Sequence, residues 1–146
     1  MNPAKRLSAD RLAPVPKTIT RAASFRVATG RNPKPGELGR DEIFAELADI
    51  ILDIENGVGA QKWRYRRSGR QVPVDETLKR YGLMHLHLTR KHGGQLLWLL
   101  QYDDHVLLLE VSDHSTFGDI PPGSRLVSYH AKAIADAERE MAERKP

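Results

Sequence analysis

Apolar side chains between residues 41 and 55 recur at spacings of three and four, which is the period of an amphipathic helix. They are Ile43, Phe44, Leu47, Ile50, Ile51 and Ile54. Acidic side chains occupy the other face, Asp41 is a suitable N-cap, and Asn56-Gly57 is a typical stop signal. The pattern therefore predicts a helix over Asp41–Glu55. An alanine-rich amphipathic pattern predicts a second helix over Ser128–Arg144.

Three segments in the second half of the chain have the pattern of β-strands. Polar and apolar residues alternate over Leu83–Thr89, so that His85 and His87 share one face. The segments Leu96–Tyr102 and His105–Val111 are almost continuously apolar, as in strands that are covered on both faces.

The pair Asp103-Asp104 has the length of a two-residue hairpin turn between the two apolar segments. Such a turn sets Leu100 opposite Leu107 and Trp98 opposite Leu109. We therefore predict an α+β domain, in which a small antiparallel sheet of at least three strands carries the helices on one side.

Residues 1–36 contain five prolines, few large apolar residues and an excess of basic side chains. This composition is typical of a chain that does not pack into a core, although the less polar segment Thr18–Thr29 could form a short ordered element. We expect a flexible basic arm over residues 1–36, followed by a single α+β domain over residues 37–146.

The 146 residues include no cysteine, which excludes a disulfide framework, a thiol nucleophile and an iron–sulfur or zinc–thiolate site. No apolar run approaches the roughly 20 residues of a membrane helix, and no secretory signal pattern is present. We expect a cytoplasmic protein that has no membrane partner. The sequence also has no P-loop, dinucleotide-binding, serine-hydrolase or zincin motif.

The net charge is +4, and the basic residues form two blocks separated by an acidic segment. Residues 1–40 hold nine basic and two acidic side chains, residues 41–57 hold six acidic and no basic ones, and residues 58–81 hold seven basic and two acidic ones. Clustered basic charge indicates a polyanionic partner such as RNA.

Basic and aromatic side chains alternate in the second basic block, which predicts an extended segment around Trp63. Arginine pairs with phosphates and aromatic rings stack on unpaired bases, so this pattern suits RNA. The candidate RNA-binding residues are Lys62, Arg64, Tyr65, Arg66, Arg67 and Arg80. The same pattern also fits an edge strand protected by charge, or a surface that binds an acidic protein.

Four of the six histidines lie on or beside the predicted strands. Two imidazoles on one face of a strand, about 7 Å apart along the chain, suggest either a metal site or acid/base chemistry. A metal would need a third ligand such as Asp113 or His114, and no recognisable ligand spacing supplies one, so we predict neither a metal nor another cofactor. The candidate catalytic residues are His85, His87 and His114, which could transfer protons while cations stabilise a reacting phosphate. Each histidine could instead be a half-buried structural residue.

The order of a leading helix, a basic segment and a three-stranded meander resembles the RelE/ParE-like toxin superfamily. The segments that carry the resemblance are Tyr81–Leu88, Gln95–Tyr102 and His105–Val111. The alternating His-Leu-His-Leu strand is similar to the YafO-like branch of ribosome-associated mRNA interferases. The resemblance implies catalytic residues around the end of the last strand, where His114 and Phe117 lie in this sequence.

We therefore predict the toxin component of a bacterial toxin–antitoxin pair. The resemblance implies a small endoribonuclease that cuts mRNA, usually at the ribosome, and that a cognate antitoxin protein holds inactive. The chemistry would be metal-independent proton transfer. The alternative is a non-catalytic module that binds nucleic acid or a protein through the basic segments. A metal-dependent enzyme that uses His85 and His87 is a third hypothesis.

Overall fold

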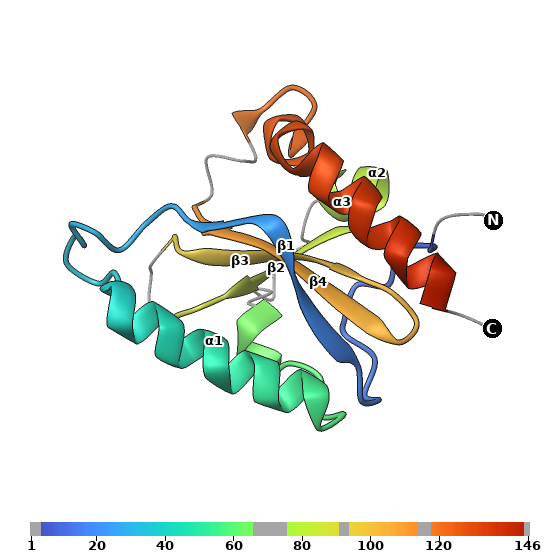
Figure 1. The fold of residues 1–146 in the computed structure, drawn as a ribbon. Helices are drawn as coiled ribbons and strands as arrows, with labels where there is room; N and C mark the ends of the chain where they lie inside the picture. Colours follow the sequence, from blue (N-terminus) through green and yellow to red (C-terminus); the bar gives the residue numbers. More distant parts are fainter. Residues whose placement is uncertain (1–3, 66–75, 91–93, 114–117, 145–146) are drawn as a thin grey trace.

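The computed structural model describes residues 4–65, 76–90, 94–113 and 118–144 as an α+β fold. The first half contains β1 (Thr18–Val27), α1 (Arg40–Glu55), a short 3-10 helix η1 (Lys62–Tyr65) and α2 (Glu76–Tyr81). The second half contains β2 (Leu83–His87), β3 (Leu96–Gln101), β4 (His105–Ser112) and α3 (Ser124–Arg144). The strands form one sheet in the order β1-β4-β3-β2 (Figure 1).

The sheet is mixed, which corrects the prediction of a purely antiparallel one. The meander β2-β3-β4 is antiparallel as predicted. β1, however, pairs with β4 in parallel, from Thr18 opposite His105 to Val27 opposite Val111. A parallel pair is not made by a hairpin, and the elements from α1 to β3 lie between these two strands in the chain.

Residues 18–27 form β1, so the flexible arm expected over residues 1–36 does not include them, and the segment Thr18–Thr29 contains the ordered element that its composition allowed. The chain just before β1 is also packed against the fold. Leu12 is buried, and the buried Lys17 ammonium donates hydrogen bonds to the carbonyl oxygens of Tyr102 and Asp103. These contacts fix the start of β1 beside the β3–β4 turn.

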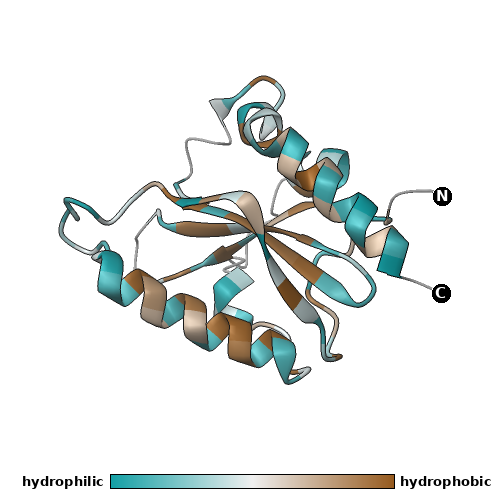
Figure 2. Ribbon diagram, in the orientation of Figure 1, coloured by the Kyte–Doolittle hydropathy of each residue, from teal (hydrophilic) through white to brown (hydrophobic). Residues whose placement is uncertain are grey.

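The helices cover both faces of the sheet, which corrects the prediction that they gather on one side. On one face, Ile43, Leu47, Ile50 and Ile54 of α1 join a core with alternate residues of the strands. On the other face, residues of α3 such as Leu126 and Ile134 pack with a second set of strand residues. Figure 2 shows the hydrophobic central strands between the two helices, and a strand sequence that is apolar on both faces requires such double cover.

Along the described ranges, no helix combines the length and the apolar character that a membrane crossing requires.

The predicted hairpin register holds near the turn and fails farther away. Leu100 lies opposite Leu107 as predicted. Trp98, by contrast, lies opposite Glu110 and not opposite Leu109, because the β3–β4 register shifts between Trp98 and Leu99. The extra residue in β4 is a β-bulge, which changes the face that the following side chain occupies. Through this shift the Glu110 carboxylate lies on the α3 face, where it contacts His130.

Candidate functional site

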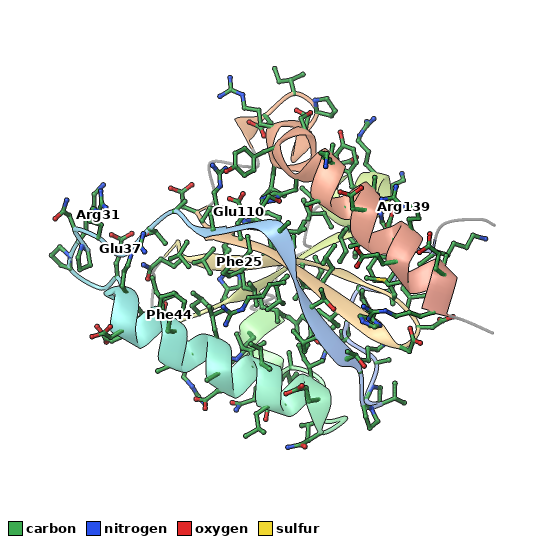
Figure 3. The ribbon with its side chains drawn as sticks, in the orientation of Figure 1. Phe25, Arg31, Glu37, Phe44, Glu110 and Arg139 are labelled. Atoms are coloured by element: carbon green, nitrogen blue, oxygen red, sulfur yellow. The ribbon has the colours of Figure 1, made fainter. Side chains whose placement is uncertain are left out.

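A row of four residues with side chains suited to chemistry or stacking crosses the sheet, one from each strand. His85 of β2 lies opposite Trp98 of β3, and Trp98 lies opposite Glu110 of β4. Arg26 of β1 completes the row opposite Glu110. The Arg26 Nε atom donates to Glu110 Oε1 over 3.1 Å, and both lie on the α3 face. Figure 3 shows Glu110 on the side of the sheet nearer α3, whereas Phe44 belongs to α1 on the opposite side.

His85 and His87 are neighbours on the same face of β2, as the alternating pattern predicts. Their ring centroids are 5.6 Å apart in an edge-to-face arrangement, and the His85 ring lies 5.1 Å from the Trp98 ring. His85 is half-buried, while His87 is 6% exposed. Because β2 is an edge strand, the two imidazoles lie at one edge of the sheet.

The end of β4 is aligned with this histidine pair. His87 lies opposite Leu96, which in turn lies opposite Ser112, the last residue of β4. The third predicted catalytic residue, His114, follows Ser112 by two positions but lies outside the described residues, as does Phe117. Ser112, two residues before His114 in the sequence, is therefore aligned across β3 with His87.

A hydrogen-bonded chain of three buried or half-buried side chains joins β1, α3 and β4. The Ser24 Oγ atom lies 2.5 Å from His130 Nδ1, and His130 Nε2 lies 2.7 Å from Glu110 Oε1. An ionised carboxylate can only accept, so Nε2 carries a proton and donates a hydrogen bond to Glu110. In the neutral ring, Nδ1 then accepts a hydrogen bond from the Ser24 hydroxyl.

The Glu110 carboxylate is held in its ionised form. Burial acts to raise its pKa, but the hydrogen bond from His130 and the nearby charge of Arg26 outweigh this effect, so the pKa lies below its ordinary value. Glu110 therefore places a negative charge beneath the exposed guanidinium of Arg26.

The Arg26 guanidinium is also stacked on an aromatic ring. Its central carbon lies 3.7 Å from the centroid of the Tyr129 ring, and Tyr129 meets His130 edge to face. The Arg26 side chain is 43% exposed, and Tyr129 is 53% exposed. This pair forms the solvent-facing surface above the Ser24–His130–Glu110 chain.

Arg64, a predicted RNA-binding residue, is a buried structural cation, which is a correction. It is 2% exposed, donates to Glu46 Oε2 over 2.7 Å and to the His87 carbonyl oxygen over 3.2 Å. Glu46 belongs to α1, so this ion pair ties η1 to α1 and to β2. A guanidinium that is buried and paired in this way does not reach a phosphate in solution.

The other predicted RNA-binding residues are divided between the surface and the undescribed parts of the chain. Lys62 and Arg80 are exposed, on η1 and α2, and both of these elements contact β2. Tyr65 is half-buried, and its hydroxyl accepts a hydrogen bond from the Leu12 amide over 2.9 Å. Arg66 and Arg67 lie outside the described residues.

The segment around Trp63 is a 3-10 helix and not the extended chain that the alternation predicts. The half-buried Trp63 ring has a guanidinium carbon at 4.3 Å from Arg64 and another at 5.1 Å from Arg90. Arg90 is exposed, so this cluster combines an aromatic ring with accessible positive charge beside the end of β2.

Sequence reasoning missed four residues of the candidate site: Ser24, Arg26, Glu110 and His130. One signal was present, because Glu110 interrupts an otherwise apolar strand, and a carboxylate in such a position needs a buried partner. The other three lie in a segment expected to be an arm and in a predicted helix without a functional motif. Among the described residues, no group of three histidine, aspartate or glutamate side chains is arranged to hold a metal ion.

Comparisons of the chain with known proteins give no match. The chain matches no protein family, and neither the curated proteins nor the solved structures contain a match to it. The functional argument therefore depends on the geometry of the site.

Proposed function

We propose that this protein is a metal-independent endoribonuclease that acts as the toxin of a bacterial toxin–antitoxin pair. The observation that carries the proposal is the pair of imidazoles on β2, with ring centroids 5.6 Å apart. Its substrate would be mRNA at the ribosome, in the cytoplasm, and a cognate antitoxin would hold it inactive.

The reaction needs a base near the ribose 2′-hydroxyl and an acid near the 5′-oxygen that leaves. A neutral imidazole takes the proton of the ribose 2′-hydroxyl, whose oxygen attacks phosphorus. The bond from phosphorus to the 5′-oxygen breaks, and a protonated imidazole gives its proton to that oxygen. The products are a 2′,3′-cyclic phosphate and a free 5′-hydroxyl.

The separation of the two rings supports this division of roles. A hydrogen bond spans about 3 Å, so oxygens of one phosphate can lie near both rings, and the half-buried His85 is more accessible than His87, which is 6% exposed. His114, close in sequence to the end of β4, is the third candidate for either role. Lys62 and Arg80, which are exposed on elements beside β2, supply positive charge for the phosphate, and Arg66 and Arg67 are proposed for the same purpose.

The test is induced expression in a bacterium without any antitoxin gene, followed by measurement of growth and of RNA integrity. We expect growth arrest and RNA fragmentation in the cells. We also expect the purified protein to cleave RNA when a metal chelator is present. The variants His85→Ala, His87→Ala and His114→Ala should lower the cleavage rate by about 10²- to 10⁴-fold for each residue that transfers a proton.

His105→Gln is the matched control, because His105 is also a buried strand histidine but lies at the opposite end of β4. Its cleavage rate should equal that of the wild type. If the wild type neither arrests growth nor fragments RNA, the toxin proposal is wrong. If all three histidine variants cleave at the wild-type rate, the acid/base mechanism is wrong.

The alternative of a non-catalytic nucleic-acid-binding module is favoured by one observation, the half-buried Trp63 ring with the exposed Arg90 beside it. Aromatic rings with adjacent cations bind single-stranded nucleic acid without any catalytic group. This alternative predicts salt-sensitive RNA binding that His85→Ala leaves unchanged, and no RNA fragments.

A further inference from the structure

Two contacts hold the exposed Arg26 guanidinium in one orientation. Its Nε atom donates to Glu110, and its guanidinium lies flat on the Tyr129 ring. Lys132 and Arg125, by comparison, are more than nine-tenths exposed. An arginine that is already oriented loses less side-chain entropy when it binds a ligand.

The contact with Glu110 uses only one of the five N–H donors of the guanidinium. Within the ranges that the structure describes, the Arg26 side chain makes no other hydrogen bond. The two terminal amino groups therefore form a free fork on a side chain that is 43% exposed. This fork has the geometry that recognises a phosphate or a carboxylate through two parallel hydrogen bonds.

We propose that Arg26 binds a backbone phosphate of the RNA that flanks the cleaved one. This inference depends on the proposed function and extends its site from β2 to β1. Glu110 and Tyr129 position the guanidinium, and neither of them touches the phosphate. The ligand is thus a phosphodiester group of single-stranded RNA.

The sheet register explains why the phosphate would be a flanking one. Arg26 and His85 belong to the same row but are separated by three strand spacings. At about 4.8 Å each, these spacings amount to roughly 14 Å. Two side chains at this separation do not hold the same phosphate, but they can hold two phosphates of one RNA strand that passes outside the buried Trp98 and Glu110.

The irregularity of β1 supports a functional role for this position. The register with β4 shifts between Arg21 and Arg26, so that the intervening residues have no regular partners. Ser24, which lies within the shifted segment, and Arg26, which follows it, both contact polar groups of the α3 face. Bulges frequently re-aim side chains next to active sites, and this one directs an arginine toward the Glu110 carboxylate.

The test measures binding of a short single-stranded RNA that carries 2′-O-methyl groups and therefore cannot be cleaved. Fluorescence anisotropy at a series of salt concentrations gives the slope of log affinity against log salt. Each phosphate contact to a single strand contributes about 0.7 to this slope. We expect Arg26→Gln to reduce the slope by about 0.7 and the affinity by about tenfold.

Arg21→Gln is the matched control, because it removes the same charge from the same exposed strand. The Arg21 guanidinium lies 5.4 Å from the Phe25 ring, which packs against the α1 core, so this residue is on the other face of the sheet. Its slope should equal that of the wild type. Arg26→Lys should keep the slope but lose affinity, because an ammonium retains the charge without the fork.

Three outcomes decide between the proposals. If Arg26→Gln melts at the wild-type temperature and keeps the wild-type slope, or if the wild type does not bind this RNA, the Arg26 inference is wrong. If the wild type cleaves RNA while Arg26→Gln binds with an unchanged slope, only the inference fails and the proposed function stands. If Arg26→Gln lowers the slope but the wild type cleaves no RNA, the phosphate site stands and the endoribonuclease proposal fails.

Discussion

The two faces of the sheet differ in the side chains that they bury. The α1 face is mainly an apolar core of leucine, isoleucine, valine and methionine, with the Arg64–Glu46 ion pair and the buried amides of Gln95 and Gln101 at its edges. The α3 face has apolar residues too, but it also encloses buried polar side chains that form two separate clusters. One is the Ser24–His130–Glu110–Arg26 chain, and the other joins Arg6, Tyr102 and Glu138.

The two polar clusters of the α3 face have different surroundings. Glu138 accepts from Tyr102 over 2.6 Å and from Arg6 over 2.6 Å, which ties the N-terminal segment to α3 and β3. Burial, followed by the hydrogen bond to Glu138, raises the pKa of Tyr102, so its hydroxyl remains a donor. In the other cluster, Arg26 and Tyr129 are exposed to solvent, and Arg26 belongs to the same row across the sheet as His85. The comparison teaches that a buried polar network becomes a candidate site where it ends at an accessible, oriented group.

The largest effect on stability is expected from the α1 face. Leu97→Ala removes a side chain that is fully buried there and should lower the free energy of unfolding by about 2–5 kcal/mol. Urea unfolding measures the change. Leu52→Ala is the control, since Leu52 is 56% exposed on α1 and should change stability little. The RNA cleavage per folded molecule should not change in either variant, and a loss in Leu97→Ala would contradict the assignment of the chemistry to the α3 face.

A smaller and pH-dependent effect is expected from Glu110→Gln. The pKa of Glu110 is lower in the folded protein than its ordinary value of 4.5, so its charge stabilises the fold above that pH. This contribution disappears as the pH falls through the folded pKa. We expect the variant to lose about 1–3 kcal/mol at neutral pH, and the difference from the wild type to vanish well below pH 4.5.

Unfolding experiments at several pH values test this prediction. Asp136→Asn provides the comparison, because Lys132 and then Arg139 lower the pKa of this carboxylate, whose side chain is 39% exposed. Asp136→Asn should lower the free energy of unfolding by less than Glu110→Gln does at neutral pH. A Glu110→Gln loss of the same size at neutral and at acidic pH would show that the shape of the side chain matters and its charge does not.

The smallest effect is expected in the second polar cluster of the α3 face. Tyr102→Phe removes one hydrogen bond, but Glu138 keeps its partner Arg6, so no buried charge is left alone. The free energy of unfolding should fall by about 0.5–1.5 kcal/mol, as measured by denaturant titration. RNA binding and cleavage should not change. A loss of RNA cleavage in this variant would extend the functional region along α3 and weaken the distinction between the two clusters.

The parts of the fold that depend on neighbouring residues were predictable from the sequence. The periodicity of residues 41–55 located α1 to within one residue, and the turn at Asp103-Asp104 fixed the pairing of Leu100 with Leu107. The alternation over Leu83–Thr89 correctly separated Met84 and Leu86, which face α1, from His85 and His87. These signals are local because helix and hairpin geometry repeat over a few residues.

The sequence by itself therefore determined the amphipathic helix, the meander and the shared face of the two β2 histidines. Tertiary structure alone decided the parallel pairing of β1 with β4, the bulge that places Glu110 opposite Trp98, and the burial of Arg64. Each of these depends on contacts between segments far apart in the chain, and no local pattern records such contacts. The buried carboxylate of Glu110 needs an imidazole from α3 and a guanidinium from β1, and only the folded chain brings these groups together.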